Sequence, residues 1–367
     1  MKRFIKRSSI AVAGAAVVGL AAFNPVAAAE SLTVVSWGGA YTNSQVQAYH
    51  KPFTAKTGIK INSEDYNGGL AQVKAQVESG NVAWSLVDLE LGDVIRGCDE
   101  GLLETIDPSI LPPAPDGTPA TKDFIEGTLS ECGVGTIVWS TIVAYDANAF
   151  KGKAAPKTLK DFFDTKKFPG KRALRKNPRV NLEWALMADG VPSEKVYETL
   201  STPAGVERAL KKLSTIKKDL VWWEAGAQPP QLLADGEVIM TSAYNGRIFN
   251  AQVKENKPFE IIWDGQVWDI DLWGIPKGAK NMKTILEFVK FSTDTQRLAD
   301  QAKYISYGPV RKSSAPLVSK YAGTDIDMKP HMPTTVKNFK TALQNDFQFW
   351  ADNQDELNER FNTWLAK

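Results

Sequence analysis

The amino-acid sequence predicts an α/β protein of two lobes. Strand-like and helix-like segments alternate from residue 32 onward, a pattern typical of a sheet covered by helices. One β-branched run, 135–145, is about twice the length of an ordinary strand, and a strand of that length can cross between lobes. The chain also exceeds the size at which one hydrophobic core usually stops growing, so two packed units are expected.

The first 29 residues are typical of a secretory signal peptide. Basic side chains between residues 2 and 7 precede an uncharged run from Ile10 to Phe23, and small residues follow up to Ala29. That run has 14 residues, fewer than the ~18 of a membrane-spanning helix. We expect cleavage after Ala29. Because Glu30 follows and not cysteine, we expect no lipid anchor and no membrane insertion.

The charge of the mature chain argues against several kinds of partner. Cleavage would leave 40 basic and 42 acidic side chains, a net charge of −2, with the two signs interspersed. Binding to nucleic acid or to an anionic membrane requires a clustered positive surface. We therefore expect neither partner.

The two cysteines, Cys98 and Cys132, predict a structural disulfide, because an even pair in an exported chain usually pairs. A metal or redox site is not expected, since the cysteines are far apart and only His50 and His331 could join them. No cofactor is expected.

The predicted elements begin as a series of β-loop-α units. Gly38 and Gly39 end the first strand in a loop. The expected elements before residue 100 are a strand over 32–37, a helix over 43–57, a strand over 59–62, a helix ending near 80 and a strand over 86–89.

The remaining elements define the expected lobes. Residues 103–120 are proline-rich and predict a surface excursion. Long elements are expected over 135–145, 237–244 and 268–276, and helices over 283–292 and 336–365. Lobe one is assigned to residues 30–142 plus 272–320, and lobe two, with the C-terminal helices, to residues 143–271 plus 321–367.

Six segments resemble the extracellular solute-binding family that contains the putrescine- and spermidine-binding proteins of bacterial ABC importers. They are SWGGAY at 36–41, LVDLELGD at 86–93, VWSTIVAYD at 138–146, LLADGEVIMTSAYNGRI at 232–248, DLWGIPKGAKN at 271–281 and YGPVRKSSA at 307–315. The resemblance implies the type II periplasmic-binding-protein fold, in which crossing hinge strands join two lobes and the ligand lies between them. It also implies a periplasmic monomer that delivers a small amine-containing solute, such as a polyamine, to an inner-membrane permease.

The expected ligand site lies at the carboxyl ends of strands, where open α/β sheets bind ligands. Trp37, Glu90 and Ser140 fall at or near such ends, and Gly38 and Gly39 follow Trp37 directly. Aromatic side chains wall amine sites because their faces attract cations. The candidate walls are Trp37, Tyr41, Trp139, Trp223, Tyr244 and Tyr307, with packing in the lobe cores as the alternative for each.

Two charged residues suggest the class of ligand. Asp271 aligns with the family carboxylate that receives an ammonium group; the alternative is a salt bridge. Arg247 departs from the family pattern S-x-W-x-G-D, because the segment from Ser242 ends here in arginine. A guanidinium group suits a carboxylate, so we hypothesise a zwitterionic ω-amino acid of the 4-aminobutyrate kind. In the alternative, Arg247 points away and pairs with Glu224 or Asp264.

An enzyme is the weaker interpretation. The sequence contains no GxSxG, HExxH, P-loop or GxGxxG motif. If the protein were an enzyme, it would be a secreted hydrolase that depends on paired carboxylates. Glu183 and Glu90 are acids that either face the cleft or lie in solvent. We expect no catalytic residues.

Overall fold

The structure, a computed structural model, describes residues 31–367. The expected signal peptide and its cleavage site lie outside these residues. Within 31–367, no helix combines the length and the apolar character that crossing a membrane requires.

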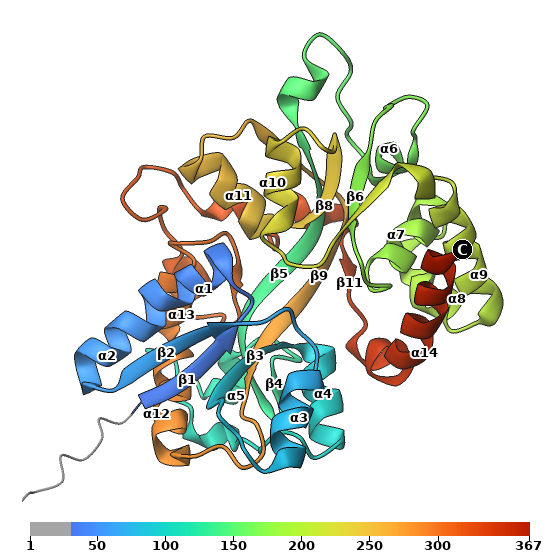
Figure 1. Cartoon of the computed structure of the whole chain (residues 1–367). Helices are drawn as coiled ribbons and strands as arrows, with labels where there is room; N and C mark the ends of the chain where they lie inside the picture. Colours follow the sequence, from blue (N-terminus) through green and yellow to red (C-terminus); the bar gives the residue numbers. More distant parts are fainter. Residues whose placement is uncertain (1–30) are drawn as a thin grey trace, which may run out of the picture.

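All the strands join one mixed sheet in the order β2-β1-β3-β9-β5-β8-β6-β7, with β4 and β10 on β5 and β11 on β9 (Figure 1). The strands are β1 Ser31–Ser36, β2 Lys60–Asp65, β3 Leu86–Glu90, β4 Leu129–Ser130, β5 Gly133–Asp146, β6 Arg172–Arg175, β7 Leu220–Trp223, β8 Met240–Tyr244, β9 Phe259–Gly274, β10 Gly308–Pro309 and β11 Leu343–Gln344. β1 pairs in parallel with β2 and β3, and β6 in parallel with β7 and β8. Parallel strands at both ends of the sheet are what the alternating pattern predicts.

Helices cover both faces of this sheet. They are α1 Gly39–Gln45, α2 Lys51–Thr57, α3 Ala71–Ser79, α4 Leu91–Asp99, α5 Ala120–Asp123, α6 Leu159–Phe163, α7 Asn181–Ala188, α8 Val196–Leu200, α9 Pro203–Ser214, α10 Gln228–Ala234, α11 Asn245–Lys254, α12 Met282–Ser292, α13 Thr295–Gln301 and α14 Phe347–Ala366. A π-helical segment, η1, joins α1 to α2 over Val46–His50. The expected helix over 336–365 is instead a 3-10 turn, β11 and α14.

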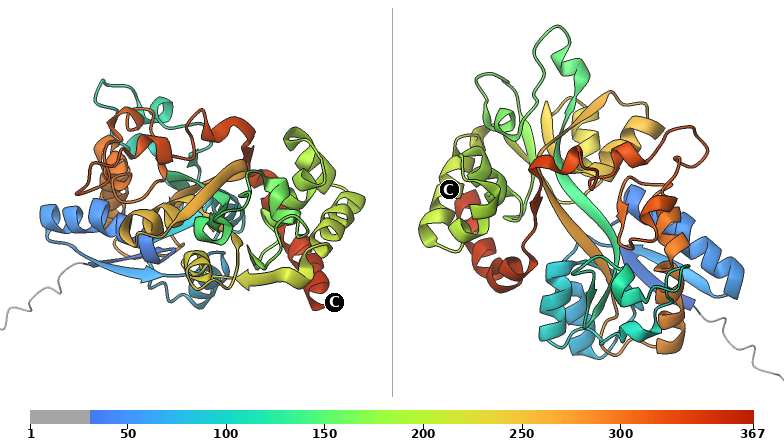
Figure 2. Two further views of the ribbon diagram at one scale, coloured as in Figure 1. Left: turned by 90° about the horizontal axis from the view of Figure 1, so that it is seen from above. Right: turned by 180° about the vertical axis from the view of Figure 1, so that it is seen from behind.

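Two large hydrophobic cores show the predicted two-lobe α/β fold. The first core takes its residues from 32–138 and 270–310, and the second from 143–267 and 343–364. Figure 1 shows α1–α4 and α12 around the first core and α6–α9 with α14 around the second; Figure 2 shows the same separation from above and behind. The boundaries near 142, 272 and 320 remain predictions.

Two long antiparallel strands connect the lobes. β5 has 14 residues and β9 has 16, and they pair along most of their length with register shifts between Gly135 and Ile137 and between Thr141 and Val143. The prediction of a third long strand over 237–244 was wrong. β8 starts at Met240 and has five residues, because the chain still turns after α10 at Gly236. A run of apolar residues does not by itself reveal where a strand begins, and so does not give its length.

The predicted disulfide is confirmed. Cys98 near the end of α4 bonds Cys132, which directly precedes β5, across a sequence separation of 34 residues. The bond therefore ties a helix of the first lobe to the start of a crossing strand.

We predict that replacing both Cys98 and Cys132 by serine lowers the free energy of unfolding by about 2–4 kcal/mol, because the closed loop restricts the unfolded chain. Guanidinium unfolding of the mature protein measures this change. Wild-type protein under reducing conditions is the matched control and should lose a similar amount. An unchanged midpoint in the double variant would contradict the prediction.

Candidate functional site

A small cavity lies between the lobes and is lined by eight side chains. They are Trp37, Tyr41, Glu90, Trp139, Tyr244, Arg247, Asp271 and Tyr307, and all eight belong to the predicted site. Several stand where a strand gives way to a loop or helix: Trp37 follows β1, Glu90 ends β3 and Tyr244 ends β8. The sheet thus brings strand ends from distant parts of the chain to one place.

Aromatic rings form most of the cavity wall. The ring centroids of Trp139 and Tyr244 are 5.0 Å apart, and those of Tyr41 and Tyr307 are 5.3 Å apart, both in edge-on geometry. Trp223 packs on the far side of Tyr244 at 5.5 Å. Such contacts fix the rings before a ligand arrives, and the exposed faces suit a cation once water is excluded.

Asp271 is an acid of the cavity lining that has no cationic partner among residues 31–367. Its Oδ1 accepts a hydrogen bond from the indole Nε1 of Trp139 at 2.6 Å, and its side chain is buried. None of the ion pairs among residues 31–367 includes Asp271, so the expected alternative of a salt bridge is wrong. Burial, followed by the neighbouring charge of Asp88, raises the pKa of Asp271 well above its ordinary value.

Arg247 reaches across the cleft from the first turn of α11, which lies against α1. Its Nη1 donates to the Gly38 carbonyl at 2.8 Å and its Nη2 to the Trp37 carbonyl at 2.9 Å. Its Nε is buried and has no acceptor among the described residues. The alternative prediction is therefore wrong: Glu224 pairs with Lys176, and Asp264 accepts from the backbone of Leu159.

Gly39 is required beside this guanidinium group. Its φ of 58° lies in the left-handed region, and a Cβ atom there would be 2.7 Å from Arg247 Nη1. Gly38 contributes the carbonyl oxygen that Nη1 contacts. Neither glycine is among the cavity-lining residues, so a direct ligand contact by either remains a prediction.

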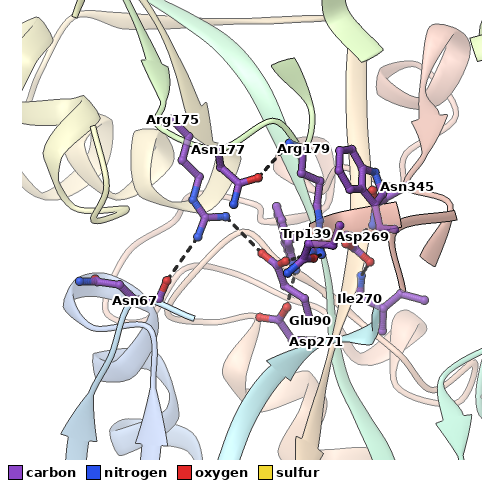
Figure 3. A network of polar contacts seen from close by, with 12 residues as sticks. Asn67, Glu90, Trp139, Arg175, Asn177, Arg179, Asp269, Ile270, Asp271 and Asn345 are labelled. Atoms are coloured by element: carbon purple, nitrogen blue, oxygen red, sulfur yellow. Dashed lines mark hydrogen bonds and ion pairs between the residues drawn. The ribbon is translucent and has the colours of Figure 1, made fainter. Parts of the chain in front are cut away.

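Glu90 is held by two arginines from the opposite lobe. Its carboxylate pairs with Arg175, the last residue of β6, at 3.4 Å, and with Arg179, which follows that strand (Figure 3). Arg179 also donates to Gln354 on α14, and Arg175 to the carbonyl of Asn67. We call Glu90, Arg175 and Arg179 the interlobe clasp. Because the clasp neutralises Glu90, this acid has little charge left for a ligand.

Asp88 is completely buried and lies on β3, on the same face of the sheet as Asp271 of the neighbouring strand β9. It accepts hydrogen bonds from Trp37 Nε1 at 3.2 Å, Tyr41 Oη at 2.9 Å and Gln45 Nε2 at 2.6 Å. The strand register sets Trp273 opposite Asp88 and Asp271 opposite Glu90, so Asp88 and Asp271 are diagonal neighbours. Burial raises the pKa of Asp88 to about 7.

Three other predicted residues lie outside the main cavity. Trp223 lines a small adjoining cavity, and its Nε1 donates to Ser242 Oγ at 3.0 Å. Ser140 lines neither cavity; its backbone N–H donates to Asn245 Oδ1. Glu183 is buried against Trp350 and Tyr197, away from both cavities. Ligand contacts by Ser140 and Trp223 remain predictions.

Sequence reasoning missed Asp88, Arg175 and Arg179. An acid in the middle of the apolar segment 86–89 was one signal, since a buried carboxylate requires partners. The arginines at the carboxyl end of the segment 172–175 were another, because ligand-facing side chains gather at such ends.

Comparison with known proteins identifies the family. Residues 48–334 match the family described as bacterial extracellular solute-binding protein. The chain belongs to this family. The gamma-aminobutyric acid-binding protein of Pseudomonas aeruginosa is 44% identical over 341 residues, 93% of this chain and 92% of that protein.

Solved structures of other solute-binding proteins share the fold. The GABA receptor Atu4243 is 32% identical with a TM-score of 0.77, over 92% of this chain and 98% of that one. The periplasmic binding protein MotA of A. tumefaciens B6, in complex with glucopine, is 28% identical with a TM-score of 0.82, over 91% and 99%. The solute-binding protein described here is therefore a component of an ABC transporter and not an enzyme, and the alternative of a hydrolase is wrong.

The narrower resemblance to polyamine binders is weaker than expected. The spermidine/putrescine-binding protein PotD of Streptococcus pneumoniae is 15% identical with a TM-score of 0.66, over 92% of this chain and all of that one. A likeness at that identity shows the fold alone. The family is confirmed, whereas putrescine and spermidine have less support as ligands than 4-aminobutyrate or other amino acids.

We predict that Arg179→Gln weakens ligand binding by about 10–100-fold, because a buried acid that loses a partner destabilises the closed arrangement. Calorimetric titration measures the affinity. Arg96→Gln is the matched control: Arg96 on α4 also contacts α14, through Asp355 at 3.1 Å, but Asp355 is 80% exposed. Surface pairs contribute about 0–1 kcal/mol, so equal losses in both variants would contradict the clasp.

We also predict that the ligand-free protein becomes less stable as pH rises from about 6.5 to 8.5. Burial raises the pKa of Glu183 to about 7 and that of Asp269 to about 8. The folded state therefore holds protons that the unfolded state has lost, and this stabilisation disappears as pH rises through the folded pKa values. The histidines oppose the trend only at the lower edge of the window, because burial lowers their pKa values in the folded state and the unfolded imidazoles lose their protons by about pH 7.5.

Urea unfolding at the two pH values tests this effect. Glu183→Gln should remove about 0.8 kcal/mol of the decline, whereas Glu194→Gln, a substitution on the exposed surface, should leave it intact. A flat wild-type profile between pH 6.5 and 8.5 would rule the effect out.

Proposed function

We propose that this solute-binding protein captures a zwitterionic ω-amino acid, of which 4-aminobutyrate is the type, in the periplasm and delivers it to an inner-membrane permease. One observation carries the proposal. The same cavity is lined by an acid without a cationic partner, Asp271, and by a buried guanidinium group, Arg247, whose Nε has no acceptor among residues 31–367.

The ammonium end of such a ligand suits Asp271. A buried carboxylate without a counter-charge is costly, and an ammonium group supplies that charge through a short hydrogen bond. Trp139 orients the carboxylate through its 2.6 Å hydrogen bond. The aromatic faces of Trp139, Tyr41 and Tyr244 add cation–π attraction.

The carboxylate end suits Arg247. A guanidinium group has five N–H donors, and the two backbone carbonyls use only part of this set. A ligand carboxylate at Nε and one Nη would satisfy the buried donor in a bidentate arrangement. Because Arg247 is anchored to the loop after β1, residues from both sides of the cleft would position this end of the ligand.

The charge balance disfavours a diamine. A second ammonium group would need a second free carboxylate, but Glu90, the other acid lining the cavity, is already neutralised by Arg175 and Arg179. It would also meet the positive charge of Arg247. The names of two relatives, the gamma-aminobutyric acid-binding protein and the GABA receptor Atu4243, support the same ligand class.

Closure of the cleft is the proposed mechanism of capture. A ligand that contacts both lobes stabilises the closed arrangement more than the open one, and the permease would read the closed form. No covalent step is required. We further propose that the mature protein, cut after Ala29, acts as a periplasmic monomer.

Calorimetric titration of the mature protein with 4-aminobutyrate and with putrescine tests the proposal. We expect saturable binding of 4-aminobutyrate and no measurable binding of putrescine. Arg247→Gln should weaken 4-aminobutyrate binding at least about 100-fold, because a charge-assisted bidentate contact is lost. Arg208→Gln, on the exposed surface of α9, is the control and should bind as wild type does.

Saturation by putrescine without any response to 4-aminobutyrate or related amino acids would sink the proposal. So would an Arg247→Gln variant of unchanged affinity, since the carboxylate would then be bound elsewhere.

A further inference from the structure

We propose that Asp88 is a positioning residue for the ligand's ammonium group: in the ligand-free protein it shares one proton with Asp271, and this proton leaves to solvent when the ammonium group binds. The inference rests on the proposed function, because it places an ammonium group at Asp271. It adds a residue that lines no cavity, and it adds a proton to the binding reaction.

The geometry of the pair requires a shared proton. Asp88 and Asp271 are diagonal neighbours on one face of the paired strands β3 and β9, both are buried, and no ion pair among residues 31–367 includes either acid. Two ionised carboxylates in this arrangement would repel each other without compensation, so one of them keeps a proton. The donors to Asp88 are neutral: an indole N–H, a phenol O–H and an amide N–H. None of these cancels a charge, and the donor to Asp271, the indole of Trp139, is neutral as well.

The charged groups around the pair do not replace that proton. Those facing it from neighbouring elements are Glu90 on β3, Asp93 on α4, Asp269 on β9, Arg175 and Arg179 near β6, and Arg247 on α11. Arg175 and Arg179 are engaged by Glu90, and Arg247 by the Trp37 and Gly38 carbonyls. The other groups, Glu90, Asp93 and Asp269, are acids, and negative charge near the pair favours retention of the proton.

The tyrosines around the pair stay neutral. They are Tyr41 on α1, Tyr49 in η1, Tyr66 after β2, Tyr244 at the end of β8 and Tyr307 before β10. Burial raises the pKa of each hydroxyl group above its ordinary value. The proton is therefore held by the two carboxyl groups alone.

An ammonium group bound at Asp271 replaces the shared proton as the positive charge beside the two acids. It supplies one positive charge on the cavity side, so both carboxyl groups can ionise and Asp88 becomes the buried second acceptor that holds Asp271 in place through the surrounding donors. Raised pKa values agree with this account, since burial brings that of Asp88 to about 7. The affinity should then fall up to about tenfold per pH unit below the pKa of the pair and stay flat above it.

Calorimetry near pH 6.5 in buffers of different ionisation enthalpy measures the proton directly. The ammonium and carboxyl groups of 4-aminobutyrate do not titrate near this pH, so proton release reports on the protein. We expect about 0.5–1 proton released per ligand bound. In Asp88→Asn the release should fall to near zero, because the amide donates to Asp271 without a titrating proton.

Asp269→Asn is the matched control. Asp269 is also a buried acid of β9 with a raised pKa, but its partner is Asn345 Nδ2 at 2.6 Å and it does not line the main cavity. This variant should release as many protons as wild type. Release that persists in Asp88→Asn, or that disappears in Asp269→Asn, would overturn the inference.

The wild-type measurement decides the matter even if Asp88→Asn fails to fold. Infrared difference spectra of wild-type protein should lose the band of a protonated carboxyl group on addition of 4-aminobutyrate. Binding without proton release or band loss would overturn the inference and leave the proposed function standing. Neither heat nor thermal stabilisation with 4-aminobutyrate would overturn the proposed function and this inference together.

Discussion

The antiparallel pairing of β5 with β9 is the constraint on which the rest of the structure depends. These two strands run through both lobes, and their register places Trp139 opposite Asp269 and Ile137 opposite Asp271. The indole of Trp139 thereby reaches the carboxylate of Asp271, and the remaining wall residues assemble around that contact. Because the ladder is continuous, bending at its two register shifts would move one lobe against the other without breaking the sheet.

Polar contacts across the cleft complement this hinge. The interlobe clasp joins β3 to the segment after β6, while Arg247 joins α11 to the loop after β1. Both devices bury charge, which is favourable only when every partner is in place. Closure is therefore sensitive to whatever fills the cavity, because a ligand of the wrong charge leaves at least one of these groups unsatisfied.

Much of the site was predictable because the sheet obeys general rules. Strand ends cluster, so Trp37 and Glu90 were found from strand positions. Tyr244 was found as an aromatic wall residue, and Arg247 from its departure from a family pattern. Ser140 shows where this reasoning fails. Side chains alternate along a strand, and because Trp139 and Thr141 face the cavities, Ser140 between them faces away.

The missed residues share a different cause. Asp88, Arg175 and Arg179 act through partners that are more than 40 residues away in sequence, so no local pattern announces them. The length of β8 was predicted wrongly for a related reason. Only its pairing with β5 and β6, which depends on tertiary structure, shows that it ends within one lobe.

The electrostatic state of the cavity links these observations to selectivity. One acid is neutralised by the clasp, two more share a single proton in our proposal, and one guanidinium group retains a buried donor. In the proposed function, a ligand with one ammonium and one carboxylate group gives both the Asp271 side and Arg247 a partner of opposite charge. A diamine would leave a positive charge beside Arg247, and a simple acid would leave the Asp271 side without a cation. In the proposed function, selection among small solutes depends on the cost of imperfect charge compensation more than on the strength of any single contact.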